Sequence, residues 1–89
     1  MKLRNGWNID FQKNIHMYCH SLIVKKGNKQ YEVPCEDTPT GSLGIWLYEI
    51  GFDETTLSDL QASLTEWAKS AGLTYRIYNT PDACVTNES

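Results

Sequence analysis

The stretch that decides the fold is FDETTLSDLQASLTEWAKSAGL, which covers residues 52–73. Asp53 is suited to accept hydrogen bonds from the free N–H groups of a first helical turn, and Gly72 can adopt the left-handed conformation that closes a helix. The pattern predicts an amphipathic helix over 53–71. Its apolar stripe, at offsets of three, four and seven residues, consists of Leu57, Leu60, Leu64, Trp67, Ala68 and Ala71.

The rest of the chain must supply the surface that covers this stripe, and its N-terminal part has the pattern of strands. Between residues 7 and 23 the odd positions are mostly apolar and the even positions mostly polar, a period of two. One strand of that length would be too long for a small domain, so we expect a turn over 12–14. Gly27-Asn28 is a two-residue hairpin signal, and Pro34 is expected to end the strand that follows.

Residues 43–50 carry an apolar run that fits two structures. Leu43, Trp46 and Ile50 would share one face of a helix, but Gly44 weakens a helix, and a short apolar run also suits a buried strand. The spacing favours a second, short helix over 43–50.

These elements together predict the fold class. Residues 73–78 alternate again and predict a last strand. We therefore expect an α+β fold with an antiparallel sheet of about four strands and the helix of 53–71 packed on one face. Residues 1–79 are expected to form one domain, and 80–89 a partly flexible C-terminal tail.

Composition indicates a small folded protein outside the membrane. The chain has 89 residues and ten aromatic side chains, which argue against disorder. No segment approaches the roughly 18 apolar residues of a membrane span, and no apolar run follows Lys2 and Arg4 as in a signal peptide. The three cysteines have no framework spacing and fit free thiols, so we expect a cytoplasmic protein.

The residues His16, Cys19 and His20 are of types that bind zinc, which makes a small zinc-binding domain one hypothesis. In a strand, however, the two histidines lie about 13 Å apart and Cys19 points to the opposite face. We therefore expect no metal and no cofactor. Cys35 precedes two acidic residues that disfavour a thiolate, and no catalytic motif occurs, so we also expect no enzyme activity.

Charge is divided along the chain. Residues 1–35 contain six Lys or Arg and two acids, whereas residues 36–89 contain two Lys or Arg and nine acids. Such a division can steer a charged partner. We therefore predict a non-enzymatic protein-binding module for a partner with a basic surface. Small acidic α+β proteins of this kind include inhibitors and adaptors from phages and mobile elements. The predicted partner-binding residues are Glu36, Asp37, Asp53, Glu54 and Asp59.

Nucleic-acid binding is the alternative. Three lysines cluster at the predicted hairpin turn, and two tyrosines on the flanking strands could stack on bases. The acidic half of the chain would oppose a polyanion, which makes this the less favoured hypothesis. Its residues are Lys25, Lys26, Lys29, Tyr18 and Tyr31.

Overall fold

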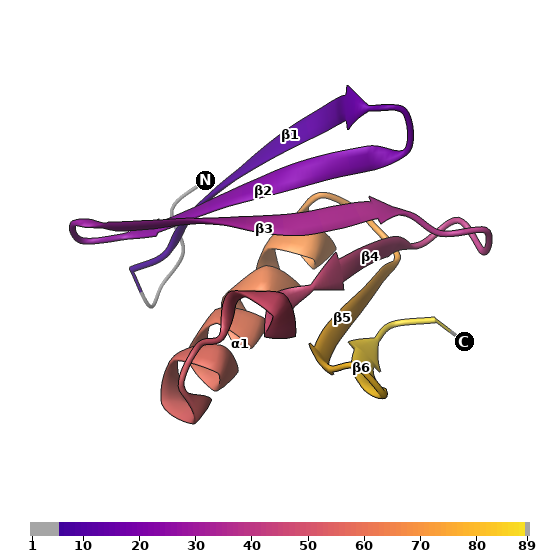
Figure 1. The fold of residues 1–89 in the computed structure, drawn as a ribbon. Helices are drawn as coiled ribbons and strands as arrows, with labels where there is room; N and C mark the ends of the chain where they lie inside the picture. Colours follow the sequence, from indigo (N-terminus) through magenta and orange to yellow (C-terminus); the bar gives the residue numbers. More distant parts are fainter. Residues whose placement is uncertain (1–5, 89) are drawn as a thin grey trace.

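The chain folds into one mixed sheet with a long helix on one of its faces. The computed structural model describes residues 6–88, and the side chains of all of them except 14–16. The elements are β1 (Asn8–His16), β2 (Cys19–Lys26), β3 (Lys29–Asp37), β4 (Leu43–Trp46), the 3-10 helix η1 (Leu47–Ile50), α1 (Glu54–Ser70), β5 (Tyr75–Thr80) and β6 (Ala83–Thr86). The strands lie in the sheet in the order in which they occur along the chain (Figure 1).

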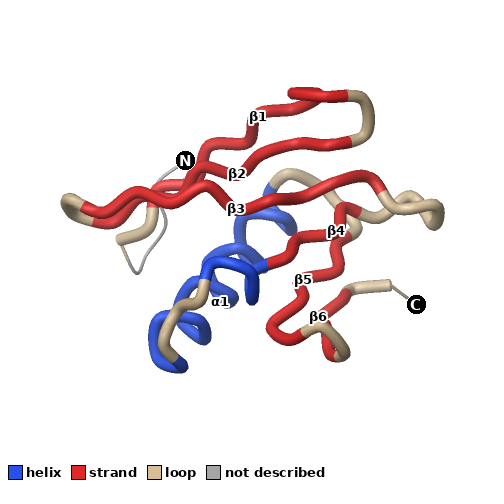
Figure 2. The backbone as a smooth tube through the Cα atoms, viewed as in Figure 1, coloured by secondary structure: helices blue, strands red, loops and turns tan. Residues whose placement is uncertain are grey.

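The predicted α+β class and its one main helix are confirmed, but four antiparallel strands is an undercount. The described residues form a six-stranded mixed sheet (Figure 2). Neighbouring strands are antiparallel except β4 and β5, which are parallel because α1 carries the chain across between them. No helix within residues 6–88 has the length and apolar content needed to cross a bilayer.

The helix α1 occupies the predicted stretch, with Asp53 at its N-cap position and Ala71 at its C-cap position. The Asp53 carboxylate makes no capping hydrogen bond to the backbone. At the other end Gly72 has a φ of 71°, and the Leu73 N–H donates to the Ala68 carbonyl at 2.9 Å. This bond closes the helix in the way a left-handed C-terminal residue allows.

The core lies between α1 and one face of the sheet. The helix buries Leu60, Leu64, Trp67 and Ala68 of its predicted stripe, whereas Ala71 is exposed. Alternate positions of the strands supply the opposing surface. These buried strand residues are Ile9, Leu22, Val24, Val33, Cys35, Leu43, Ile45, Tyr75 and Ile77.

The first turn lies further along the chain than predicted. β1 continues through residues 12–14 to His16, and the chain turns at Met17 and Tyr18. The pairs Gln12–Ser21 and His16–Cys19 place four steps of β1 opposite two steps of β2. The interruption of the apolar series at Lys13 therefore marks an irregularity in the strand, which adds twist without ending the pairing.

The second hairpin forms as predicted, but Pro34 does not end β3. Lys26 and Lys29 are the last pair of the β2–β3 ladder, with two residues between them. The Asp37 N–H donates to the carbonyl of Tyr18, the residue before β2. The backbone N–H and C=O groups of odd-numbered β3 residues therefore point toward β2, and those of even-numbered residues point away from it. Pro34 therefore lacks a donor only on the side of β4, where pairing begins one residue later.

The segments 43–50 and 80–89 also differ from expectation. Residues 43–50 divide into strand β4 and the 3-10 helix η1, so the predicted short helix holds only for the second half. The expected tail contains β6, which pairs with β5. Beyond it, Glu88 accepts hydrogen bonds from the side chains of Ser42, Thr40 and Arg76, which hold this segment against the sheet.

Candidate functional site

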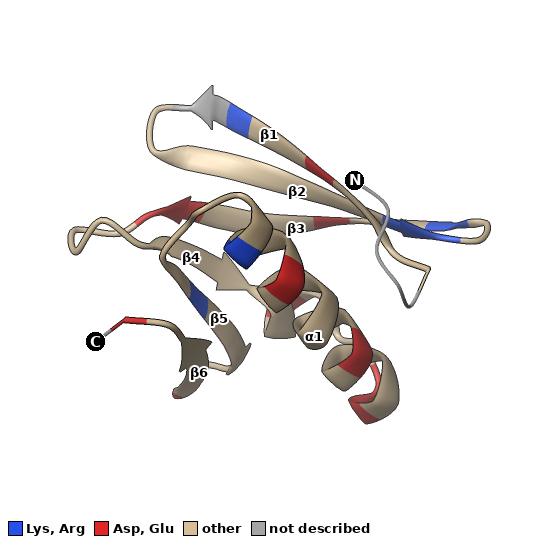
Figure 3. Cartoon of the chain, turned by 180° about the vertical axis from the view of Figure 1, so that it is seen from behind, with Lys and Arg blue, Asp and Glu red and all other residues tan. Residues whose placement is uncertain are grey.

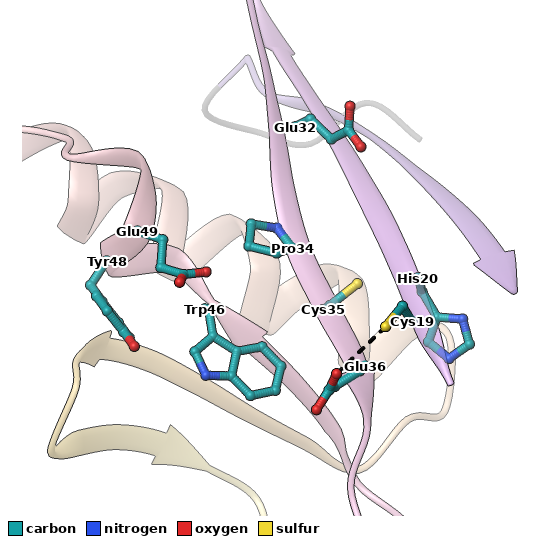
Figure 4. Close-up of a pocket in the computed structure, with 9 residues that line it drawn as sticks. All are labelled: Cys19, His20, Glu32, Pro34, Cys35, Glu36, Trp46, Tyr48 and Glu49. Atoms are coloured by element: carbon teal, nitrogen blue, oxygen red, sulfur yellow. Dashed lines mark hydrogen bonds between the residues drawn. The ribbon is translucent and has the colours of Figure 1, made fainter. Parts of the chain in front are cut away.

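The face of the sheet opposite α1, which we call the open face, is hollowed beside β3. Glu32, Pro34 and Glu36 alternate along β3 and so share this face. β4 pairs with β3 over only three residues before η1 turns the chain away, and this divergence leaves a groove of about 550 Å³ (Figure 4). The groove is lined by Cys19, His20, Glu32, Pro34, Cys35, Glu36, Trp46, Tyr48 and Glu49.

Trp46 lines this groove with an indole ring that its neighbours hold in place. The ring stacks on Tyr78 of β5, with centroids 5.8 Å apart and planes inclined by 17°. It also passes over Gly44, where an added Cβ atom would come within 2.9 Å of the indole Cη2 atom. The missing side chain at Gly44 therefore makes room for the indole, and Tyr78 fixes its plane.

Carboxylates surround the groove. Glu32, Glu36 and Glu49 are exposed, and among residues 6–88 no Lys or Arg lines the groove. Arg76, opposite Gly44 on β5, is bound instead to Glu88, with Nε to Oε2 at 2.6 Å. Figure 3 shows Lys residues gathered at the far hairpin of β2 and β3. The groove therefore favours a positively charged ligand.

The surroundings of the two cysteines beside the groove favour the protonated thiol over the thiolate. Burial raises the pKa of Cys35 to about 12, and the Asp37 charge adds to this shift. Burial also raises the pKa of Cys19, whose Sγ donates to Glu36 Oε2 at 3.6 Å. A nucleophilic cysteine requires the opposite shift, so neither thiol has the environment of a catalytic residue.

The five acidic residues predicted to bind a partner do not lie together, and only Glu36 lines the groove. Its neighbour Asp37 lies on the opposite face of the sheet, where its carboxylate contacts His20. The Asp37 Oδ1 atom lies 3.1 Å from Nε2 of His20, whose side chain is fully buried. His20 in turn packs edge-on against Phe11, with ring centroids 5.3 Å apart. Asp37 is therefore engaged within the fold.

The other three predicted acids lie at the N-terminal half of α1. Asp59 accepts hydrogen bonds from Trp7 Nε1 at 3.0 Å and Lys26 Nζ at 3.1 Å, which ties β1 and the β2–β3 hairpin to the helix. Asp53 lines the same hollow as Asp59. The hydroxyl of Thr56 lowers the pKa of Asp53. Glu54 is the first residue of α1.

The structure brings the residues of the nucleic-acid hypothesis together only in part. Tyr31 packs its ring against Phe52, with centroids 4.8 Å apart, and is not a free stacking surface. Tyr18 is exposed, but it lies at the opposite end of β2 from the three lysines, about 25 Å away along an eight-residue strand. Tyr31 nevertheless lines one hollow with Lys26 and Lys29, whereas Tyr18 lies apart from the three lysines.

The described side chains give no support to the zinc hypothesis. The His16 side chain lies outside the described residues. Cys19 and His20 are consecutive in β2 and point to opposite faces, as predicted. Among the side chains that the structure describes, no three of the types His, Cys, Asp and Glu come together as a metal site. The absence of a metal stays a prediction.

Four residues that give the groove its charge and its aromatic surface were missed by the sequence reasoning: Glu32, Trp46, Tyr48 and Glu49. Glu32 could have been found, because it alternates with Val33 in the same period-two pattern that places Glu36 on the exposed face. Trp46, Tyr48 and Glu49 could not, because a helix over 43–50 would orient them differently.

Searches with the chain against protein-family models, curated proteins and solved structures find no match.

Proposed function

We propose that this protein is a non-enzymatic protein-binding module that holds a positively charged segment of a larger partner in the groove. The observation that carries this proposal is the composition of the groove. It combines three glutamates with Trp46 and Tyr48, and none of the described residues that line it is a Lys or Arg. Aromatic side chains supply contact area at low entropic cost, and complementary charge speeds encounter and selects the partner.

The edge of β3 supports an extended conformation for the bound segment. β3 starts at Lys29, but its pairing with β4 covers only Cys35–Asp37. The backbone groups of Gln30 and Glu32 face away from β2, and within residues 6–88 no strand pairs with them on that side. A peptide that lay along this edge could hydrogen-bond to it as an added strand.

The roles that fit binding without chemistry are inhibition or adaptation of a larger complex, and the small acidic chain fits an origin in a phage or mobile element. The nucleic-acid alternative has less support, because Tyr18 lies apart from the three lysines, Tyr31 packs against Phe52 and Lys26 is bound to Asp59. A polyanion would also be repelled by the glutamates of the groove.

Capture from an extract of the source organism tests the proposal with three baits. The groove variant carries Glu32→Gln, Glu36→Gln and Glu49→Gln. A matched control, Glu54→Gln, Glu66→Gln and Asp82→Asn, removes the same charge from exposed positions elsewhere. We expect a protein that the wild type and the control retain and the groove variant loses. A partner retained equally by all three baits would place the binding surface elsewhere.

A further inference from the structure

The protein already contains one indole that holds a cation with the help of a carboxylate. Lys26 Nζ lies 5.5 Å from the ring centroid of Trp7 and 3.1 Å from Oδ2 of Asp59. The same Asp59 oxygen accepts the indole N–H of Trp7 at 3.0 Å. This arrangement satisfies the charge of Lys26 with both a ring face and an anion.

The groove contains the same two kinds of group, and the part of the chain that the structure describes places no Lys or Arg in its lining. Trp46 supplies a partly exposed indole, and Glu36 and Glu49 supply carboxylates near it. Glu32 lies four residues from Glu36 on β3, about 13 Å further along the groove. The stick view shows the Trp46 ring lying among Glu36, Glu49 and Pro34 (Figure 4). One side of this ring is stacked on Tyr78. The ring is therefore fixed before any ligand arrives, which lowers the entropic cost of binding on it.

From this comparison we propose that the groove recognises the guanidinium group of an arginine side chain in the partner's segment, stacked on Trp46 and bonded to Glu36 and Glu49. The inference rests on the proposed function and adds the chemistry of the ligand. Guanidinium is planar and weakly hydrated, so it stacks on an aromatic ring better than an ammonium does. Its five N–H donors can also serve two carboxylates at once, whereas lysine acts as a point charge.

A titration with small probes tests this recognition without the partner. The ligand is N-acetyl-arginine amide, compared with N-acetyl-lysine amide and the uncharged N-acetyl-citrulline amide, each added to ¹⁵N-labelled protein up to its solubility limit. The readout is the indole N–H signal of each tryptophan. Trp7 and Trp67 are internal controls, because Trp7 is bound to Asp59 and Trp67 is buried at 6% exposure.

We expect a saturable shift of the Trp46 signal with the arginine probe, at least about threefold weaker binding of the lysine probe, and none of the citrulline probe. Gly44→Ala should abolish the shift, because its Cβ atom would displace the indole without changing any charge. The groove variant with three glutamines should weaken it at least about tenfold, whereas the matched acid control should not. A melting curve confirms that each variant is folded.

Three results would overturn the inference: no shift of Trp46 with arginine, an equal shift with citrulline, or equal binding of arginine and lysine. Its failure is distinguishable from that of the proposed function. If the arginine titration fails while capture from the extract still depends on the groove glutamates, the groove binds a partner through other chemistry. If Trp46 responds to the arginine probe but the groove variant still captures every protein that the wild type captures, the proposed function fails and the arginine-binding site stands.

Discussion

Trp46 and Tyr78 stack across the parallel pair of strands β4 and β5, with ring centroids 5.8 Å apart. Trp46 also lines the groove, so the stack connects the wall of the groove to the strand that follows α1. The indole of Trp46 stacks on Tyr78 and packs closely over Gly44, so its orientation does not depend on a ligand.

Removing the phenol ring should weaken binding more than folding. An aromatic pair contributes about 0.5–1.5 kcal/mol beyond the area it buries, so Tyr78→Leu should lower the affinity for a groove ligand by about two- to tenfold. Titration calorimetry with the captured partner measures this change. Tyr48→Leu, which removes an aromatic of the groove without touching Trp46's support, serves as the comparison. Unchanged affinity in Tyr78→Leu would show that the stack does not position Trp46.

Trp67 of α1 should contribute more to the stability of the fold than Trp46 on the open face. It is 6% exposed, lies on the buried side of α1 and contacts Phe11, with ring centroids 5.5 Å apart. Truncation of a buried Trp costs about 3–5 kcal/mol, and a small domain is stable by about 5–15 kcal/mol. We expect Trp67→Ala to be largely unfolded or strongly destabilised in urea titrations followed by circular dichroism. Trp46→Ala, on the open face, should cost only a fraction of this, and equal costs would contradict the assignment of faces.

The segment after β6 should confer a pH dependence on stability. The Ser42 hydroxyl, followed by Arg76, lowers the pKa of Glu88 from its ordinary value of 4.5. Because the folded pKa is lowered, the stabilisation is fully present above about pH 4.5 and is lost as the pH falls through the folded pKa. Glu88→Gln should therefore be less stable than the wild type at pH 7, and the difference should shrink in acid. A difference that is constant across this range would contradict the role given to Glu88.

Charge reversal separates the protein-binding proposal from the nucleic-acid alternative. Lys25 and Lys29 are exposed at the hairpin, and Lys26 must be left in place because it bonds to Asp59. We expect Lys25→Glu with Lys29→Glu to leave partner binding intact, and Glu32→Lys with Glu36→Lys to abolish it. Surface plasmon resonance at two salt concentrations should also show that the association rate falls with salt. Loss of binding in the lysine variant alone would favour nucleic acid.

The elements that are specified locally could be predicted from the sequence. The α1 pattern combines a 3.6-residue period with an N-cap residue and a closing glycine, and the second hairpin has a two-residue turn. In each case a few adjacent residues determine the conformation. The wrong predictions concern segments whose conformation is determined by pairing with strands that are distant in the sequence. The stretch 43–46 is a strand because β3 and β5 flank it on both sides, and β6 exists because its partner β5 offers an edge.

The groove was harder to predict for the same reason. It forms where β3 extends beyond its paired residues with β4. The length of that unpaired stretch depends on strand register and not on any sequence motif. Glu36 was identified from its charge alone, while Asp37, one residue later, proves to face buried His20. Alternation along β3 distinguishes these two acids, because a strand sends consecutive side chains to opposite faces.

Site-specific photo-crosslinking tests most directly whether the groove holds a positively charged protein segment. A photoreactive phenylalanine in place of Tyr48, which lines the groove, is compared with one in place of Ser58, on the exposed side of α1. After irradiation in an extract of the source organism, the crosslinked peptides are identified by mass spectrometry. The account predicts that position 48 alone crosslinks to one protein, at a segment that contains arginine, and that the three groove glutamines abolish the product. Crosslinks of equal yield from both positions, or a nucleic-acid adduct at position 48, would contradict it.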